Sequence, residues 1–207
     1  SSPHAAHRDP HVRRRRQRQM CIRDRYPAAC NAVETLLVHR DIAGEFLPPL
    51  AAALAEKKVT LKGTEEVARI IPVEVISDDD FHKEYTDLIL AVKLVGSTEE
   101  AVRHINRYGS HHTDSILTED DTAAQTFMAL VDSAGVYRNA STRFADGFRY
   151  GFGAEVGIST SKLHARGPVG LEGLMSYKYK LFGDGHTAGD YAEGKKSFHF
   201  KDIPPEE

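Results

Sequence analysis

The stretch Tyr26-Pro-Ala-Ala-Cys-Asn-Ala-Val-Glu-Thr-Leu-Leu-Val-His39 sets a cysteine among small residues, directly before an apolar run. Pro27 fixes its own φ angle and biases Tyr26 toward an extended conformation. The alanines leave room for a substrate to approach the sulfur of Cys30. Residues 34–39 have the length and composition of a short buried strand. The stretch therefore predicts a cysteine at a turn that leads into a sheet, where it is either a nucleophile or a buried structural thiol.

Downstream of this strand, apolar runs of strand length alternate with segments of helical periodicity. Such alternation is typical of an α/β fold with an open, mostly parallel sheet and crossover helices. We expect strands at residues 34–39, 59–62, 85–95, 115–118, 134–139 and 174–182. We expect helices at residues 43–57, 65–70, 97–108 and 118–131. Pro48 and Pro49 either fall in the first turn of helix 43–57 or break it.

Capping signals set the expected helix boundaries. Ser97 and Glu100 form a capping box at the start of one helix, and Gly109 ends it. Thr118 caps the next helix, whose apolar stripe comprises Ala124, Phe127, Met128 and Val131. After the last of the central strands, residues 140–170 are rich in glycine and lack the helical period, which is typical of a functional or disordered segment.

The first 25 residues differ in composition from the rest. They carry eight arginines against two aspartates and have almost no apolar content, so we expect disorder. This leader has three interpretations: a nucleic-acid or nuclear-import patch, a mitochondrial transit peptide, or foreign sequence. We favour foreign sequence, because Met20-Cys-Ile-Arg-Asp-Arg25 resembles translated sequencing adapter and abuts the cysteine stretch without a linker. The native chain would then begin near Tyr26, and Cys21 would have no role.

Composition limits the class of protein. The chain after the leader has a net charge of about −9, which argues against broad nucleic-acid binding. The two cysteines lie nine residues apart in a chain without a signal peptide, which indicates a reducing compartment rather than a disulfide framework. No apolar run approaches the length of a membrane span, so we expect a soluble protein.

Four segments, in one order along the chain, carry a specific resemblance to a known family. They are the cysteine stretch, Ala101-Val-Arg-His-Ile-Asn-Arg-Tyr-Gly-Ser-His-His-Thr-Asp-Ser-Ile116, residues 139–159 with Asn139-Ala-Ser-Thr-Arg-Phe-Ala-Asp-Gly147, and His164-Ala-Arg-Gly-Pro-Val-Gly-Leu-Glu172. They resemble segments of gamma-glutamyl phosphate reductase, also called glutamate-5-semialdehyde dehydrogenase, in the aldehyde dehydrogenase superfamily. The resemblance covers essentially all of residues 26–185.

The resemblance implies NADPH-dependent reduction of L-glutamate 5-phosphate to L-glutamate 5-semialdehyde, with release of phosphate, in proline biosynthesis. The Cys30 thiolate would attack the acyl carbonyl and expel phosphate, and hydride transfer to the resulting thioester would give the aldehyde. No hydrolytic water is needed, so no general base is assigned. In this family most of the nucleotide-binding domain precedes the cysteine. We therefore expect a truncated catalytic part that neither binds NADPH tightly nor turns over alone.

Six residues are the candidates for this chemistry. The backbone N–H groups of Cys30 and Asn31 are candidate oxyanion donors. Arg143, beside Ser141 and Thr142, could bind a carboxylate or phosphate bidentately, or could form a surface ion pair. Glu84 precedes the long strand 85–95, at the place where aldehyde dehydrogenases carry a glutamate that contacts the nicotinamide ribose.

Three other patterns predict no site. His111 and His112 are adjacent on an extended chain and point to opposite faces, so we expect no metal site there. The run Gly151-Phe-Gly-Ala-Glu-Val-Gly157 lacks the spacing and strand-to-helix context of a dinucleotide fingerprint and predicts a tight connection. Arg166, like Arg143, could bind an anion or form a surface ion pair, but the sequence supports a binding role for it less.

We expect a leader at residues 1–25, a catalytic domain at 26–170, and a C-terminal strand with a frayed tail at 171–207. Strands like 174–182 pair across subunits in the superfamily, so a homo-oligomer is expected. The resemblance implies a small-molecule substrate, a functional link to glutamate 5-kinase and a cytoplasmic location, or a mitochondrial one within a bifunctional eukaryotic synthase. The alternatives are an oxidative semialdehyde dehydrogenase of the same superfamily and a nucleic-acid-binding module acting through the basic leader.

Overall fold

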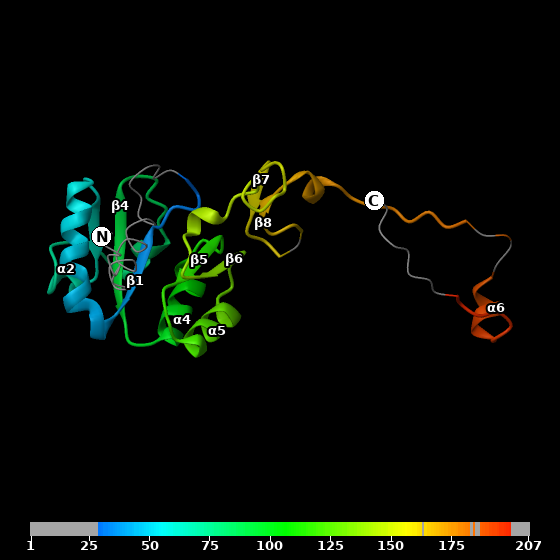
Figure 1. Ribbon diagram of the computed structural model, residues 1–207, viewed down its shortest axis with the longest axis horizontal. Helices are drawn as coiled ribbons and strands as arrows, with labels where there is room; N and C mark the ends of the chain where they lie inside the picture. The colour runs from blue at the N-terminus through cyan, green and yellow to red at the C-terminus, as the bar shows by residue number, and fades with distance from the viewer. Residues whose placement is uncertain (1–28, 163, 183, 185–186, 200–207) are drawn as a thin grey trace, which may run out of the picture. The chain divides into compact units, whose positions relative to one another are not determined.

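The computed structural model describes residues 29–162, 164–182, 184 and 187–199 (Figure 1). The leader that we expect to be disordered lies outside the described residues, as do Tyr26 and Pro27. The chain divides into two compact units, residues 1–174 and 175–207. All of the described strands belong to the first unit.

A four-stranded parallel sheet forms the centre of the first unit, with the strand order β1-β4-β2-β3. Its strands are β1 (Thr35–His39), β4 (Ile89–Val95), β2 (Thr60–Gly63) and β3 (Glu74–Val75). The segments that join or follow them are α2 (Arg40–Glu56), α3 (Glu65–Ala68), the 3-10 helix η1 (Asp78–His82) and α4 (Thr98–Tyr108). β4 is nearly continuous in its burial, as a parallel strand covered on both faces should be.

Two smaller sheets complete the unit. β5 (Thr113–Ile116) and β6 (Gly135–Arg138) pair in parallel and are connected by α5 (Asp121–Leu130). β7 (Gly157–Ser159) and β8 (Gly167–Val169) pair antiparallel, and the 3-10 helices η2 (Thr142–Phe144) and η3 (Leu171–Leu174) flank them. The expected α/β fold with mostly parallel strands and crossover helices is therefore confirmed. The segment 140–170, expected to be irregular, holds this short hairpin.

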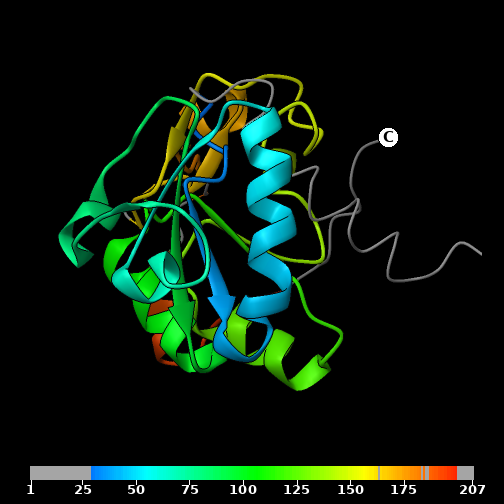
Figure 2. The same cartoon turned by 90° about the vertical axis from the view of Figure 1, so that its left-hand side faces the viewer.

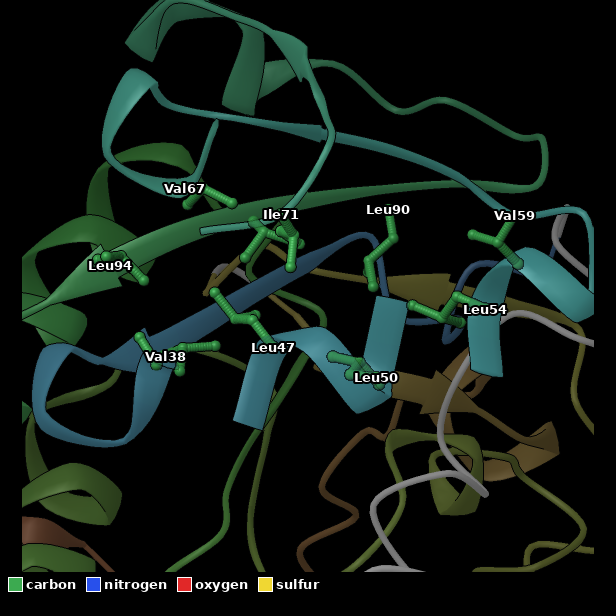
Figure 3. Close-up of a cluster of buried hydrophobic side chains, with 11 residues drawn as sticks. Val38, Leu47, Leu50, Leu54, Val59, Val67, Ile71, Leu90 and Leu94 are labelled. Atoms are coloured by element: carbon green, nitrogen blue, oxygen red, sulfur yellow. The ribbon is translucent and has the colours of Figure 1, made fainter. Parts of the chain in front are cut away.

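The main core lies between α2 and the parallel sheet. Figure 2 shows α2 lying across one face of the strands, and Figure 3 shows its leucines pointing at the sheet. Leu47 is completely buried, and Val38 of β1 and Leu90 of β4 meet it from the sheet side. β1 and β4 are in register from Thr35 opposite Ala91 onward. This packing fixes β1, and with it the chain that enters β1 from the cysteine turn.

α2 begins three residues earlier than expected and runs through both prolines without a break. His39 caps it by accepting a hydrogen bond from the N–H of Asp41. Pro48 and Pro49 are exposed, on the side of α2 away from the core. Burial of the opposite apolar face outweighs the two helical hydrogen bonds that prolines cannot donate.

α4 has the expected boundaries, with Ser97 as its N-cap and Gly109 at its end, but its capping box and the cap of α5 differ from expectation. The Ser97 side chain accepts the N–H of Glu100, as a capping box requires, but the Glu100 carboxylate accepts the N–H of Gly96 instead of Ser97. α5 is capped by Asp120, whose carboxylate accepts two backbone N–H groups, and not by Thr118. A carboxylate at the positive end of a helix is the stronger cap. Met128, expected in the apolar stripe of α5, is 47% exposed.

The second unit has little regular structure among its described residues. Residues 175–182, expected to form most of a strand, are irregular, so the expected strand is wrong for this structure. Their apolar side chains are more than half exposed: Met175, Tyr177, Tyr179, Leu181 and Phe182. A strand needs a neighbouring strand edge for its backbone hydrogen bonds, and alternation alone does not supply one. The helix α6 (Ala188–Ala192) follows. Among the described residues, no helix is both long and apolar enough to span a bilayer.

A buried histidine sits on α4 inside an aromatic cluster. The His104 ring centroid lies 4.9 Å from that of Phe81 and 4.7 Å from that of Tyr108. Burial lowers the pKa of His104 to about 4, and Lys93 and His82 add to this while Asp78 and Glu100 oppose it. His104 therefore stays neutral at neutral pH.

Replacing Leu47 with alanine should cost about 2 to 5 kcal/mol of unfolding free energy, because it leaves a cavity under α2. Urea unfolding followed by circular dichroism would measure this cost. Leu130→Ala is the control, since Leu130 is also helical but 53% exposed, and it should change the free energy much less. Equal losses in the two variants would contradict the assigned core.

His104 should make the fold acid-sensitive. An unfolded histidine binds a proton near pH 6.5 and the folded His104 only near pH 4, so the unfolded chain binds more protons between these values. Stability should be complete above about pH 6.5 and fall as the pH drops toward 4. Urea midpoints at pH 7.5 and 5 would show the loss, and His104→Leu should reduce it, whereas His164→Leu, at an exposed histidine, should not.

Candidate functional site

Cys30 lies in a tight turn at the entrance to β1. The N–H of Ala32 donates to the carbonyl of Ala29 at 2.8 Å, which places Cys30 and Asn31 at the two central positions of a β-turn. Cys30 is exposed and carries a free thiol, whereas Asn31 is buried. The expected turn before a strand is therefore confirmed, and the alternative of a buried structural thiol is wrong.

Asn31 ties this turn to a segment more than a hundred residues away. Its side-chain Nδ2 donates to the carbonyl of Ala145 at 2.9 Å, and its backbone carbonyl accepts from the Thr142 hydroxyl at 2.7 Å. Nη1 of Arg143 donates to Oδ1 of Asn31. The three partners belong to η2 or directly follow it. We call these three hydrogen bonds the Asn31 latch.

The η2 segment is itself held in place from several sides. Ser141 caps η2 by accepting the N–H of Arg143 at 3.2 Å. The hydroxyl of Ser115, on β5, donates to the carbonyl of Ala140 at 2.8 Å. Nη1 of Arg149 donates to the carbonyl of Arg143 at 2.9 Å. The parallel pair β5 and β6 therefore positions η2 next to the cysteine turn.

Opposing influences act on the Cys30 thiol. Although Cys30 is exposed, the protein partly covers its sulfur, and this partial burial raises the thiol pKa most; the negative charge of Glu155 raises it further. The nearby backbone N–H groups of Cys30 and Asn31, and the positive charge of Arg143, lower the pKa. The net direction is upward, so the resting thiol is mostly protonated at neutral pH. The two N–H groups and the Arg143 charge nevertheless favour the thiolate form.

Sequence reasoning missed Glu155. It lies in the glycine-rich run expected to be a tight connection, and positive φ angles of 82° at Gly151 and 68° at Gly153 agree with that shape. Its Oε2 accepts the N–H of Gly147 at 2.8 Å. A side chain at Gly147 would collide with the carbonyl of Ala154, so glycine permits this close approach. In the sequence, the only signal for a role of Glu155 was an isolated carboxylate among glycines.

Cys30 and Glu84 line the same cavity of about 860 Å³, whose walls include β1, α4 and β5. Glu84 is exposed, in the segment between η1 and β4. A nicotinamide cofactor needs acceptors for its ribose hydroxyls and a cradle for its phosphates. Glu84 supplies an exposed carboxylate at this cavity, whereas Glu155 is not among the residues that line it. The run 151–157 connects η2 to β7 and not a strand to a helix, so it does not form the cradle.

The other candidates have partners within the protein. Thr142 is buried with its hydroxyl on Asn31, and Ser141 is the η2 cap, which leaves Arg143 as the member of this trio with further donor capacity. Arg166 forms an ion pair with Asp132 at 2.9 Å.

The two adjacent histidines also have ring partners. Nδ1 of His111 bonds the carbonyl of Asp132, and Nδ1 of His112 bonds the Thr113 hydroxyl. Over the part of the chain that the structure describes, no group of three or more histidine, cysteine or acidic residues could hold a metal ion.

No model of a known protein family matches the chain. Over 179 residues it is 62% identical to the protein named gamma-glutamyl phosphate reductase 1 of Synechocystis, a match that covers 86% of this chain and 41% of that protein. It is 61% identical over 173 residues to a gamma-glutamyl phosphate reductase of Acetivibrio thermocellus, covering 84% of this chain and 40% of the relative. The chain thus spans about two fifths of the length of these curated relatives.

Solved structures give the same relationship. A gamma-glutamyl phosphate reductase from Thermotoga maritima is 45% identical with a TM-score of 0.79, and the match covers 83% of this chain and 42% of that one. An acetylating aldehyde dehydrogenase from Geobacillus thermoglucosidasius shares the fold at 19% identity and a TM-score of 0.50, over 81% of this chain and 48% of the other. The resemblance carried by the four sequence segments is confirmed.

Replacing Glu155 with glutamine should make Cys30 more reactive at neutral pH, because a negative charge that raises the thiol pKa is removed. The measurement is the rate of Cys30 alkylation by iodoacetamide, in a Cys21→Ser background, between pH 6 and 10. The pH midpoint of the rate should move down. Glu172→Gln, at an exposed glutamate of η3, is the control and should leave the midpoint in place. A midpoint that stays or rises in Glu155→Gln would refute this assignment.

Proposed function

We propose that this chain, a homologue of part of the gamma-glutamyl phosphate reductases, supplies the catalytic cysteine that reduces L-glutamate 5-phosphate to L-glutamate 5-semialdehyde. The observation that carries the proposal is the exposed Cys30 thiol, in a tight β-turn directly before β1. The 62% identity to the Synechocystis reductase supports the same assignment. In this role the enzyme belongs to proline biosynthesis and is functionally linked to glutamate 5-kinase.

The chemistry begins when the exposed Cys30 thiol loses its proton to solvent water. The thiolate forms a bond to the acyl carbon of the substrate, the bond from that carbon to the phosphate oxygen breaks, and phosphate leaves with the electron pair. The N–H groups of Cys30 and Asn31 donate to the oxyanion that forms on the way to the thioester. Such donors are each worth about 3 kcal/mol in comparable sites. Because phosphate is a good leaving group, the chain needs no general acid at this step.

Reductases and aldehyde dehydrogenases exchange hydride with a nicotinamide cofactor, and we propose NADPH here. When bound, it supplies the hydride that converts the thioester to the aldehyde. Glu84 is the residue that we assign to its ribose hydroxyls, and its place on the cavity that also contains Cys30 supports this choice.

We assign substrate binding to the η2 segment with Arg143 as its main group. The guanidinium is half-buried, carries a charge that acts on Cys30, and suits a phosphate or carboxylate geometrically. Ser141 and Thr142 contribute by holding η2 in place, since their hydroxyls already have protein partners.

We also propose a homo-oligomer in a reducing, cytoplasmic environment. Residues 175–182 expose an alternating row of apolar side chains that could pair with a strand edge of a second copy. The cytoplasm keeps thiols reduced, which suits a free cysteine nucleophile.

The proposal can be tested by replacing the matched segment of the Synechocystis reductase with that of this chain. The chimera should reduce NADP⁺ in the presence of L-glutamate 5-semialdehyde and inorganic phosphate, which is the reverse reaction. Cys30→Ala should lower the rate by about a thousandfold or more, because the covalent step is lost. Absorbance at the nicotinamide wavelength measures both rates.

Met128→Ala is the matched control, since it removes an exposed sulfur on α5 away from the cysteine turn and should keep the rate. Oxidation that proceeds equally well without phosphate would support the alternative, a hydrolytic semialdehyde dehydrogenase. A chimera that folds but retains its rate in Cys30→Ala would remove Cys30 from the chemistry.

A further inference from the structure

Both ends of the Asn31 side-chain amide are engaged within the protein. The nitrogen donates to Ala145 and the oxygen accepts from Arg143, while the Asn31 backbone carbonyl accepts from Thr142. An amide held at both ends has a single orientation, because a flip would place donor against donor and acceptor against acceptor. The structure thus uses Asn31 as a fastening for the turn and not as a side chain offered to a substrate.

Arg143 differs from the other two partners because it carries a charge. A cation on the amide oxygen polarises the amide and strengthens the hydrogen bond that its nitrogen donates to Ala145. Thr142 and Ala145 contribute neutral hydrogen bonds. Of the three fastenings, the one from Arg143 is therefore the strongest single candidate for control of the turn.

The Arg143 guanidinium reaches Asn31 from a fixed backbone. The N–H of Arg143 is bound by Ser141, and its carbonyl is bound by Arg149, whose guanidinium also pairs with Asp146 at 2.9 Å. A side chain that starts from a backbone held on both sides loses less entropy when it binds. This arrangement is typical of a group that orients another residue.

We propose that Arg143 is a positioning residue for Cys30 and acts on it through Asn31, by holding the turn that carries the sulfur. The inference deepens the proposed function, because it presumes that Cys30 is the nucleophile. It adds to Arg143 a role that is independent of any substrate. Its test measures the thiol alone, so it can fail or succeed whether or not the assembled reductase turns over.

Arg143 could act on Cys30 directly through its charge or indirectly through Asn31, and the two possibilities lead to different predictions. The charged groups that act on Cys30 are Glu155 and Arg143. If Arg143 acted only through its charge, removing the Asn31 side chain would leave the effect of Arg143 unchanged. If Arg143 acts through Asn31, its effect should shrink once that side chain is gone, and a double-mutant cycle measures this difference.

The experiment uses the full chain in a Cys21→Ser background, with Asn31→Ala, Arg143→Met and the double variant. Iodoacetamide alkylation of Cys30 is followed by mass spectrometry from pH 6 to 10. We expect each single variant to raise the apparent thiol midpoint by about half a unit to one unit, which lowers the rate at pH 7 about three- to tenfold. The double variant should be no slower than the slower single variant.

Arg143→Lys keeps the cation and one donor, so it should lie between the wild type and Arg143→Met, and it serves if the methionine variant does not fold. Arg138→Met is the matched control: Arg138 also binds backbone carbonyls in the first unit, those of Thr118 and Glu119, but has no bond to the cysteine turn. It should leave the alkylation profile unchanged. Circular dichroism melts establish that each variant is folded.

Two results would overturn the proposal. Additive effects of Asn31→Ala and Arg143→Met would mean that Arg143 acts on Cys30 without Asn31. An Arg143→Met profile equal to the wild type, with inorganic phosphate protecting Cys30 from alkylation only when Arg143 is present, would make Arg143 an anion-binding residue alone.

Discussion

The cysteine turn depends on the Asn31 latch, a set of hydrogen bonds between residues 111 to 114 positions apart in the chain. Asn31 is buried, and a buried amide without partners would cost about 1 to 3 kcal/mol. The amide has its hydrogen-bond partners only when β1 is packed against α2 and when β5 and β6 hold η2 next to the cysteine turn. The reactive geometry at Cys30 therefore exists only in the folded first unit, and local sequence around the cysteine does not create it.

The same arrangement explains how the Cys30 thiol can be protonated at rest and still be converted to the reactive thiolate. Burial and Glu155 favour the protonated thiol, while two N–H groups and Arg143 favour the thiolate. A protonated resting thiol resists oxidation and alkylation, since the thiolate is the reactive form. The groups that oppose protonation are also those that could meet negative charge on a substrate. Binding of an anionic acyl phosphate and activation of Cys30 would thus involve the same few side chains.

Much of the fold followed from local pattern. The apolar runs of β1 and β4, the Ser97 cap and the turn before β1 each depend on residues close in sequence, and these expectations agree with the structure. Helix boundaries were harder to predict where two residues could act as the cap. At α5, Asp120 is the cap in place of Thr118, because its carboxylate binds two N–H groups. The strand expected at 174–182 had the right alternation, but its existence depends on a partner edge that the sequence of the segment does not contain.

The residues of the site also fall into those that the local sequence indicates and those that only the folded structure reveals. Cys30 stands out in the sequence because a lone cysteine among alanines before a strand is a local signal, and Arg143 stands out because it lies among hydroxyl residues. Glu155 could not be found like this, since its effect on Cys30 arises from the folding of a glycine-rich run over Gly147. Nor could the role of the Asn31 side chain in holding the turn be predicted from its position beside the cysteine, which indicated a role only for its backbone N–H. Every group that latches Asn31 or acts electrostatically on Cys30 in the described structure comes from the first unit. The groups that set the reactivity of the thiol therefore all belong to this unit.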